Sequence, residues 1–247
     1  MESMTAPASE EALSNPRDAS LTAQEELPLS GFTLWAVFRR NPAAPVSVTD
    51  ASSSELDDAV RATAELGVTL RGFYDVSGFK ADADIMVWLH GDRAQDIQAA
   101  LRILRRTSLF APLLPTWNAM ACHRDAEFNK RHVPGFLKGL APKDWIVVYP
   151  FVRSYDWYLL PDEERSRMLA DHGRKGAAFS GAIANTVAAF ALGDYEWVLP
   201  IESDDLYELV DMMRDLRYTD ARLHVREEVP FYTGRRIQTS EIAEVLS

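Results

Sequence analysis

The order of its strand-like and helix-like segments constrains the fold of this chain more than any other feature. Within residues 31–140, apolar alternation and helical spacing predict, in turn, strand 32–38, a helix from Ser53-Ser-Glu55 to Leu66, strands 69–76 and 84–90, a helix opening at Asp92, and strand 115–122. This β-α-β-β-α-β order is typical of a ferredoxin-like unit.

Residues 141–247 repeat this alternation of strands and helices. The predicted elements are strand 146–152, helical residues 161–190, strand 196–201, helix 204–216 and strand 221–229. We therefore expect an α+β protein made of two tandem ferredoxin-like units, 31–140 and 141–247, that together form a dimeric α/β-barrel-type fold in one chain, with a pocket beneath one sheet.

Individual residues also repeat, at a shift of 112 positions. Asp92 falls on Asp204 and Thr107 on Thr219. The apolar positions Val87, Leu89, Ile97, Leu101 and Leu104 fall on Leu199, Ile201, Leu209, Met213 and Leu216. A few matching apolar positions are common between any two strand–helix segments, so the match supports duplication without proving it.

Residues 1–30 differ in composition from the rest of the chain. They are rich in Ala, Ser, Glu and Pro, and carry six acidic residues against Arg17 alone. Such a segment buries too little apolar surface to offset the entropy of ordering, so we expect a disordered acidic tail. The net charge of −11 for the whole chain argues against nucleic acid as a partner.

No apolar run approaches the roughly 20 residues of a membrane-spanning helix, and the N-terminus lacks a signal-peptide pattern, so we expect a cytoplasmic protein without membrane contact. Cys122 is the only cysteine, which excludes an internal disulfide and any site with several thiolate ligands. A metal here would have to be held by histidine, carboxylate or a cofactor.

The segment Trp145–Arg153 contains candidate site residues. Alternation along a strand places Val147, Tyr149 and Phe151 on one face, with Arg153 following on that same face. If that face lines a pocket, a phenol and a guanidinium would suit a ligand with carboxylates. The alternative is a core tyrosine and a cross-strand salt bridge.

His172 is the candidate metal ligand. Pro161-Asp-Glu-Glu164 predicts a helix start, which places His172 after roughly three turns, beside a glycine that opens space for a planar ligand. The alternative is a histidine at the helix C-terminus, with Gly173 ending the helix. The small residues of 176–190 predict a helix that another body, either a ligand or a neighbouring helix, approaches closely.

The aromatic residues that follow Arg153, and the remaining histidines, also have a functional and a simpler structural interpretation. Tyr155-Asp-Trp157-Tyr158 is dense in oxidisable rings, which are normally packing residues but could carry a radical beside an oxidising iron. His132 lies in a loop and could act as a free base. Surface solvation is its simpler explanation, and we expect it for His90, His123 and His224 too.

Four segments carry a resemblance to a known family: Tyr149-Pro150, Asp171-His172-Gly173, Gly193-Asp-Tyr-Glu-Trp197 and Val229-Pro-Phe-Tyr-Thr-Gly234. In order and spacing they resemble the chlorite dismutase-like superfamily and, within it, the actinobacterial coproheme decarboxylases. The resemblance runs from about Gly31 to Gly234.

This resemblance implies a hydrogen peroxide-dependent reaction, the last step of coproporphyrin-dependent haem biosynthesis. Fe-coproporphyrin III (coproheme) would be both substrate and redox cofactor, and haem b the product. Peroxide oxidises the bound iron porphyrin, a tyrosine becomes a radical and takes hydrogen from a propionate, and carbon dioxide leaves. Two rounds convert two propionates.

The resemblance also implies a role for individual residues. His172 resembles the proximal iron ligand and Tyr149 the catalytic tyrosine. His132 matches a distal histidine that takes a proton from peroxide, a task suited to a pKa near neutrality. Arg153 matches a position that contacts a propionate, and Trp157 a tryptophan that exchanges an electron with the tyrosine.

The chain departs from part of the superfamily at the distal position. Chlorite dismutases carry an arginine there and Firmicute decarboxylases a glutamine, whereas this chain offers Ala184 and Asn185. This departure favours the decarboxylase over a chlorite dismutase or haem peroxidase; a non-enzymatic haem-binding protein is the third alternative. Members of the family form rings, so the resemblance implies a homo-oligomer, a pentamer in this branch. It also implies transient contact with coproporphyrin ferrochelatase.

Overall fold

All the strands and helices predicted for residues 31–140 are present in the computed structural model, which describes residues 31–49, 51–124 and 133–247. The elements are β1 (Phe32–Arg39), α1 (Ser52–Glu65), β2 (Val68–Asp75), β3 (Ile85–Gly91), α2 (Ala94–Leu104) and β4 (Leu114–Cys122). The predicted tail 1–30 lies outside the described residues.

The second half contains more elements than predicted. They are β5 (Trp145–Arg153), the 3-10 turn η1 (Trp157–Leu159), α3 (Asp162–Gly176), β6 (Ile183–Ala184), β7 (Val187–Ala188), β8 (Trp197–Ser203), α4 (Leu206–Leu216), the 3-10 turn η2 (Asp220–His224), β9 (Val225–Glu227), β10 (Tyr232–Ile237) and α5 (Thr239–Val245). The boundary between the units, placed at 140/141, stays a prediction.

Two of the predicted elements are wrong. The helix predicted for 161–190 ends at Gly176, and the small residues that follow form turns and the short strands β6 and β7, which pair with β8. The strand predicted for 221–229 begins as η2, because Ala221 is buried against Trp157 and α3 instead of joining the sheet. Only β9, three residues long, is extended there.

The internal repeat holds at the level of whole elements. The bounds of β3 and α2 become those of β8 and α4 when 112 is added to each. The predicted threonine pair repeats in its bonding as well: the Thr107 hydroxyl donates to the Leu104 carbonyl at 2.7 Å, and the Thr219 hydroxyl donates to the Leu216 carbonyl at 3.0 Å. Each threonine thus satisfies a carbonyl at the end of its helix.

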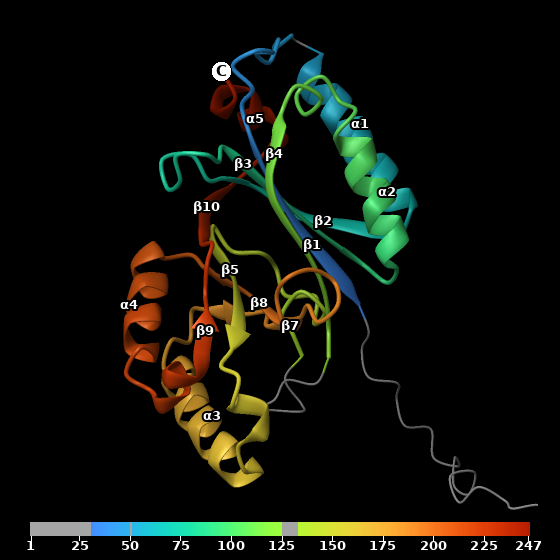
Figure 1. Cartoon of the computed structure of the whole chain (residues 1–247). Helices are drawn as coiled ribbons and strands as arrows, with labels where there is room; N and C mark the ends of the chain where they lie inside the picture. The colour runs from blue at the N-terminus through green and yellow to red at the C-terminus, as the bar shows by residue number, and fades with distance from the viewer. Residues whose placement is uncertain (1–30, 50, 125–132) are drawn as a thin grey trace, which may run out of the picture.

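Within the described residues, ten strands form one sheet that closes on itself (Figure 1). Along its length the order is β6-β8-β7-β4-β1-β3-β2-β10-β5-β9, and closure comes from the additional pairing of β8 with β5. Buried side chains from both halves fill the interior, among them Trp35, Trp88, Val148 and Val198. No helix in these residues is both long and apolar enough to cross a bilayer.

Helices cover the outside of this barrel in two separate places (Figure 1). α1, α2 and α5 pack on strands of the first half, around Leu56, Ile97 and Ile242. α4 packs on β5 and β8 through Leu209, Met212 and Leu216, and α3 lies beside α4. β5 therefore has two different faces, one directed into the barrel and one toward α4.

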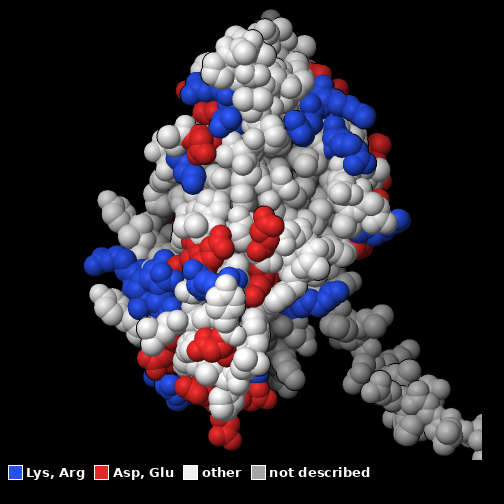
Figure 2. Space-filling view, viewed as in Figure 1, with Lys and Arg blue, Asp and Glu red and all other residues white. Residues whose placement is uncertain are grey.

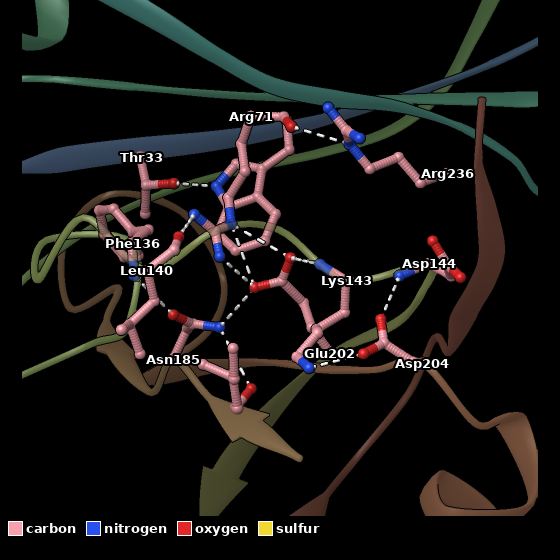
Figure 3. Close-up of polar contacts among 12 residues, drawn as sticks. Thr33, Arg71, Phe136, Leu140, Lys143, Asp144, Asn185, Glu202, Asp204 and Arg236 are labelled. Atoms are coloured by element: carbon pink, nitrogen blue, oxygen red, sulfur yellow. Dashed lines mark hydrogen bonds and ion pairs between the residues drawn. The ribbon is translucent and has the colours of Figure 1, made fainter. Parts of the chain in front are cut away.

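A buried polar network joins the two halves (Figure 3). The Arg71 guanidinium donates from Nη2 to Glu202 Oε2 at 2.6 Å and from Nη1 to the Leu140 carbonyl at 3.0 Å. Asn185 donates to the same Glu202 oxygen at 3.2 Å and accepts from the Phe136 amide at 3.0 Å. The network therefore anchors β2, β8 and the segment around Phe136 to one another.

The histidines expected on the solvated surface are more enclosed than predicted. His123 is only 6% exposed. Burial, and secondly the charge of Arg71, lower the pKa of His90 to about 4. His224 lies with Nδ1 3.1 Å from Ser154 Oγ and its ring 5.4 Å from that of Trp157. The expectation failed because neighbouring elements cover these side chains: His90 lies within β3 against the Phe136 ring, His123 directly follows β4, and His224 ends η2.

Candidate functional site

A cavity of about 610 Å³ lies between the outer face of β5 and β8 and the helices α3 and α4. This volume is within the range of about 300–1,000 Å³ that is usual for small-molecule sites. Its walls are largely apolar, from Phe179, Leu199, Ile201, Met212 and Leu216. Polar and charged groups enter it from Tyr149, Arg153, His172, Arg217, Arg222 and Glu228.

Strand alternation places Tyr149 and Arg153 on the same face of β5, as predicted, and this face lines the cavity. Ile146 and Val148 point into the barrel interior, whereas Val147 and Tyr149 pack on the α4 side. Tyr149 is 3% exposed, and its ring stacks on that of Phe231 with centroids 4.4 Å apart and planes 13° apart. The phenol is therefore held in a fixed orientation at the cavity wall.

The surroundings of Tyr149 keep its phenol protonated at neutral pH. Burial raises the pKa of this phenol, and the charge of Glu228 raises it further. The charges of Arg217 and Arg222 act in the opposite direction. The group at this wall is thus a hydrogen donor, and it can lose its hydrogen only together with an electron or to a strong base.

His172 reaches the cavity from α3. The helix begins at Asp162, after Pro161 and with three acidic residues in its first turn, as predicted. It continues to Gly176, so the alternative in which Gly173 ends the helix is wrong. A Cβ added at Gly173 would meet no atom within 4 Å, so open space lies beside the histidine.

The surroundings of His172 favour its neutral form. Burial is the largest cause that lowers the pKa of its imidazole, followed by the charge of Arg153. Nδ1 lies 3.3 Å from Thr219 Oγ1. A neutral imidazole keeps one ring nitrogen with a free electron pair, which is the form that binds a metal ion.

Arg153 and Trp157 lie side by side, but only Arg153 lines the cavity. The Arg153 guanidinium carbon lies 4.1 Å from the centroid of the Trp157 ring and 4.9 Å from that of Phe151. Trp157 itself is 0% exposed and packs against Met168 and Leu169 of α3. The predicted tryptophan is therefore one layer behind the cavity wall.

Sequence reasoning missed a charged group at the cavity, formed by Arg217, Arg222 and Glu228. Arg217 Nη1 and Arg222 Nη1 lie 2.6 and 2.7 Å from the same Glu228 Oε2. Figure 2 shows Lys and Arg side chains gathered on the side where Figure 1 places α4 and β9. The sequence signal for this group was the pair Arg217 and Arg222 on either side of Thr219, which the internal repeat aligns with Thr107.

Part of the cavity wall comes from β6 and the residues that follow it. Ala184 and Thr186 line the cavity, whereas Asn185 is fully buried and bonds to Glu202 and Phe136. Of the two residues expected at the distal position, only Ala184 therefore contacts the cavity. His132, the predicted base, lies outside the described residues.

The chlorite dismutase family model matches residues 49–237 of the chain. The coproheme decarboxylase of Mycolicibacterium smegmatis is 48% identical over 215 residues, which cover 85% of this chain and 90% of that protein. Among solved structures, chlorite dismutase from Candidatus Nitrospira defluvii in complex with imidazole is 17% identical with a TM-score of 0.76, covering 88% of this chain and 95% of that one. A tryptophan-to-phenylalanine variant of that enzyme in complex with cyanide is 15% identical with a TM-score of 0.73, at the same two coverages.

Proposed function

Because the chain belongs to the chlorite dismutase family, we propose that it is the coproheme decarboxylase of that family, which uses hydrogen peroxide to convert coproheme to haem b. The observation that carries this proposal is the convergence of Tyr149, Arg153 and His172 on one cavity. The identity of 48% to a coproheme decarboxylase supports it from a separate direction.

The residues around the cavity fit an iron porphyrin with several carboxylates. The apolar walls suit a flat macrocycle, and the open space beside Gly173 lets it approach His172. Arg153, Arg217 and Arg222 suit carboxylates, which arginine binds through two parallel hydrogen bonds. Coproheme has four propionates, so a site with several arginines favours it over haem b, which has two.

Each of these residues has a distinct task. His172 would bind the iron through the ring nitrogen that Thr219 leaves free. Arg153, with Phe151 and Trp157 fixing its guanidinium, would hold a propionate near Tyr149 on the same strand face. Trp157 would exchange an electron with Tyr149 across Arg153, although it does not contact the cavity.

Bound coproheme would supply both the propionates that react and the iron that peroxide oxidises. Tyr149 would give an electron to the oxidant that peroxide generates and its phenolic proton to a peroxide-derived oxygen, and its phenoxyl oxygen would take a hydrogen atom from a propionate side chain. Loss of a second electron from that side chain to the same oxidant would release carbon dioxide and leave a vinyl group. Each propionate consumes one peroxide and yields two molecules of water, so both oxidising equivalents are used.

His132 is the proposed base for peroxide, a role that rests on the resemblance of the sequence. His132→Ala should slow activation by peroxide while coproheme binding is preserved. Wild-type kinetics in this variant would remove the assignment.

One experiment tests the proposed function. Coproheme and then peroxide are added to the full chain, and product masses are followed. We expect loss of two carbon dioxide units in the wild type, and unchanged binding without decarboxylation for Tyr149→Phe. Tight binding with all four carboxylates retained would favour a haem-binding protein instead, and rapid oxygen release from chlorite would favour a chlorite dismutase.

We propose a homopentamer as the working assembly, which sedimentation would test.

A further inference from the structure

We propose that Thr219 is a positioning residue for His172: its side-chain oxygen accepts a hydrogen bond from Nδ1–H of the imidazole and so presents Nε2 to the cavity. Thr219 lies between α4 and η2, and is 6% exposed. Its Oγ1 lies 3.3 Å from His172 Nδ1 and 3.0 Å from the Leu216 carbonyl oxygen. The inference deepens the proposed function, because it concerns the residue proposed to bind iron.

The direction of the hydrogen bond follows from the number of protons available. A threonine hydroxyl has a single hydrogen and two electron pairs. A carbonyl oxygen can only accept, so the short contact to Leu216 requires the Thr219 hydrogen. What Thr219 offers His172 is therefore an electron pair, and Nδ1 must carry the imidazole hydrogen. The remaining nitrogen, Nε2, then has the free electron pair that a metal needs.

The internal repeat separates this role from an ordinary helix cap. Thr107 makes the same bond to Leu104, 112 residues earlier, at 2.7 Å. α1, the helix that packs on α2, contains no histidine, whereas α3, which packs on α4, contributes His172. The threonine cap therefore belongs to the repeated architecture, and within the part of the chain that the structure describes its contact with an imidazole occurs in the second half.

Because the acceptor is the Thr219 hydroxyl, it affects how strongly His172, the proposed iron ligand, donates electrons. A carboxylate in this place would pull on the Nδ1 proton and increase the electron density of the imidazole. A neutral hydroxyl is a weaker acceptor than a charged carboxylate. It fixes the ring and its tautomer, yet leaves His172 a neutral imidazole with ordinary donor strength.

The first test uses the protein without porphyrin. We would compare Thr219→Val, Thr219→Ser and the matched control Thr107→Val by nitrogen-15 NMR of the histidine rings, which distinguishes Nδ1–H from Nε2–H. We expect the Nδ1–H form of His172 in the wild type and in the serine variant, a shift toward Nε2–H in Thr219→Val, and no change in Thr107→Val. The two valine variants should lower the urea unfolding midpoint similarly, since both lose a helix cap.

An unchanged His172 tautomer in folded Thr219→Val would overturn the inference. The second measurement is the iron–imidazole stretching frequency of the ferrous coproheme complex, which should move in Thr219→Val and return in Thr219→Ser. A frequency that is the same in both valine variants would also overturn it. Product masses test the proposed function separately. If coproheme stays intact after peroxide while the tautomer results are as expected, the chain is not a decarboxylase, but the role of Thr219 is still supported.

Discussion

Arg71 of β2 and Glu202 of β8 form an ion pair between the two halves of the chain, with Nη2 and Oε2 2.6 Å apart and side chains 4% and 0% exposed. The Arg71 guanidinium also lies 4.9 Å from the centroid of the Trp88 ring. Burial raises the pKa of Glu202, and its hydrogen bonds to Arg71, Lys143 and Asn185 oppose that rise. The carboxylate therefore depends on these partners to remain charged inside the protein.

Replacement of Arg71 by methionine should destabilise the fold strongly, because Glu202 would be left as a buried charge without its main partner. The expected loss is about 3–5 kcal/mol in the free energy of unfolding, measured with urea at neutral pH. Arg61→Met, which removes an exposed pair with Asp58, should cost less than about 1 kcal/mol. Similar losses in both variants would contradict a special role for the buried pair.

The penalty of Arg71→Met should also depend on pH. Without the guanidinium the pKa of Glu202 rises further, so the folded variant binds a proton that the unfolded chain releases. Stability of the variant relative to wild type should therefore improve as the pH falls from about 8 to about 5. A penalty that stays constant across this interval would show that the loss comes from packing and not from charge.

His90 should make the stability of the folded chain sensitive to acid. Its pKa is lowered from 6.5 to about 4, so between these values the unfolded chain binds a proton that the folded chain does not. Above about pH 6.5 this difference in proton binding does not lower the free energy of unfolding. As the pH falls below that value, the free energy of unfolding decreases by at most about 1.4 kcal/mol per pH unit. His90→Gln should flatten that part of the stability curve, and an unchanged slope would refute the prediction.

Much of the candidate site could be predicted because it depends on local patterns. Alternation along β5 is enough to put Tyr149 and Arg153 on one face. The acidic start of α3 fixes where His172 falls on the helix. These features follow from strand and helix periods, which short stretches of sequence already contain.

The missed features depend on contacts between distant segments. β6 and β7 have two residues each and exist because β8 offers them hydrogen bonds, so an alanine-rich stretch that suits a helix becomes extended. A Cβ at Gly181 would lie 2.4 Å from a Glu208 oxygen, a restriction that no local pattern contains. Arg217 and Arg222 meet Glu228 only after η2 turns the chain back.

Glu228 should compete with the ligand for the cavity arginines. Its Oε2 lies 2.6 Å from Arg217 Nη1 and 2.7 Å from Arg222 Nη1. A propionate that binds these arginines would have to replace the Glu228 carboxylate. Glu228→Gln should therefore raise coproheme affinity by about three- to tenfold, measured by titration at fixed ionic strength. The exposed neighbour Glu227 controls for net charge, and an equal gain in Glu227→Gln would show that the effect is not local.

Phe231 should control the reactivity of Tyr149 without contacting the ligand. It stacks on the tyrosine ring but is not among the residues that line the cavity. Phe231→Leu removes the flat surface that fixes the phenol, at a cost of about 1 kcal/mol in stability. Because the phenol can then rotate, decarboxylation should slow severalfold while coproheme affinity changes little. Phe79→Leu, at an exposed aromatic contact with Trp145, serves as the control. A loss of affinity that matches the loss of rate would mean that Phe231 shapes the cavity and does not orient the tyrosine.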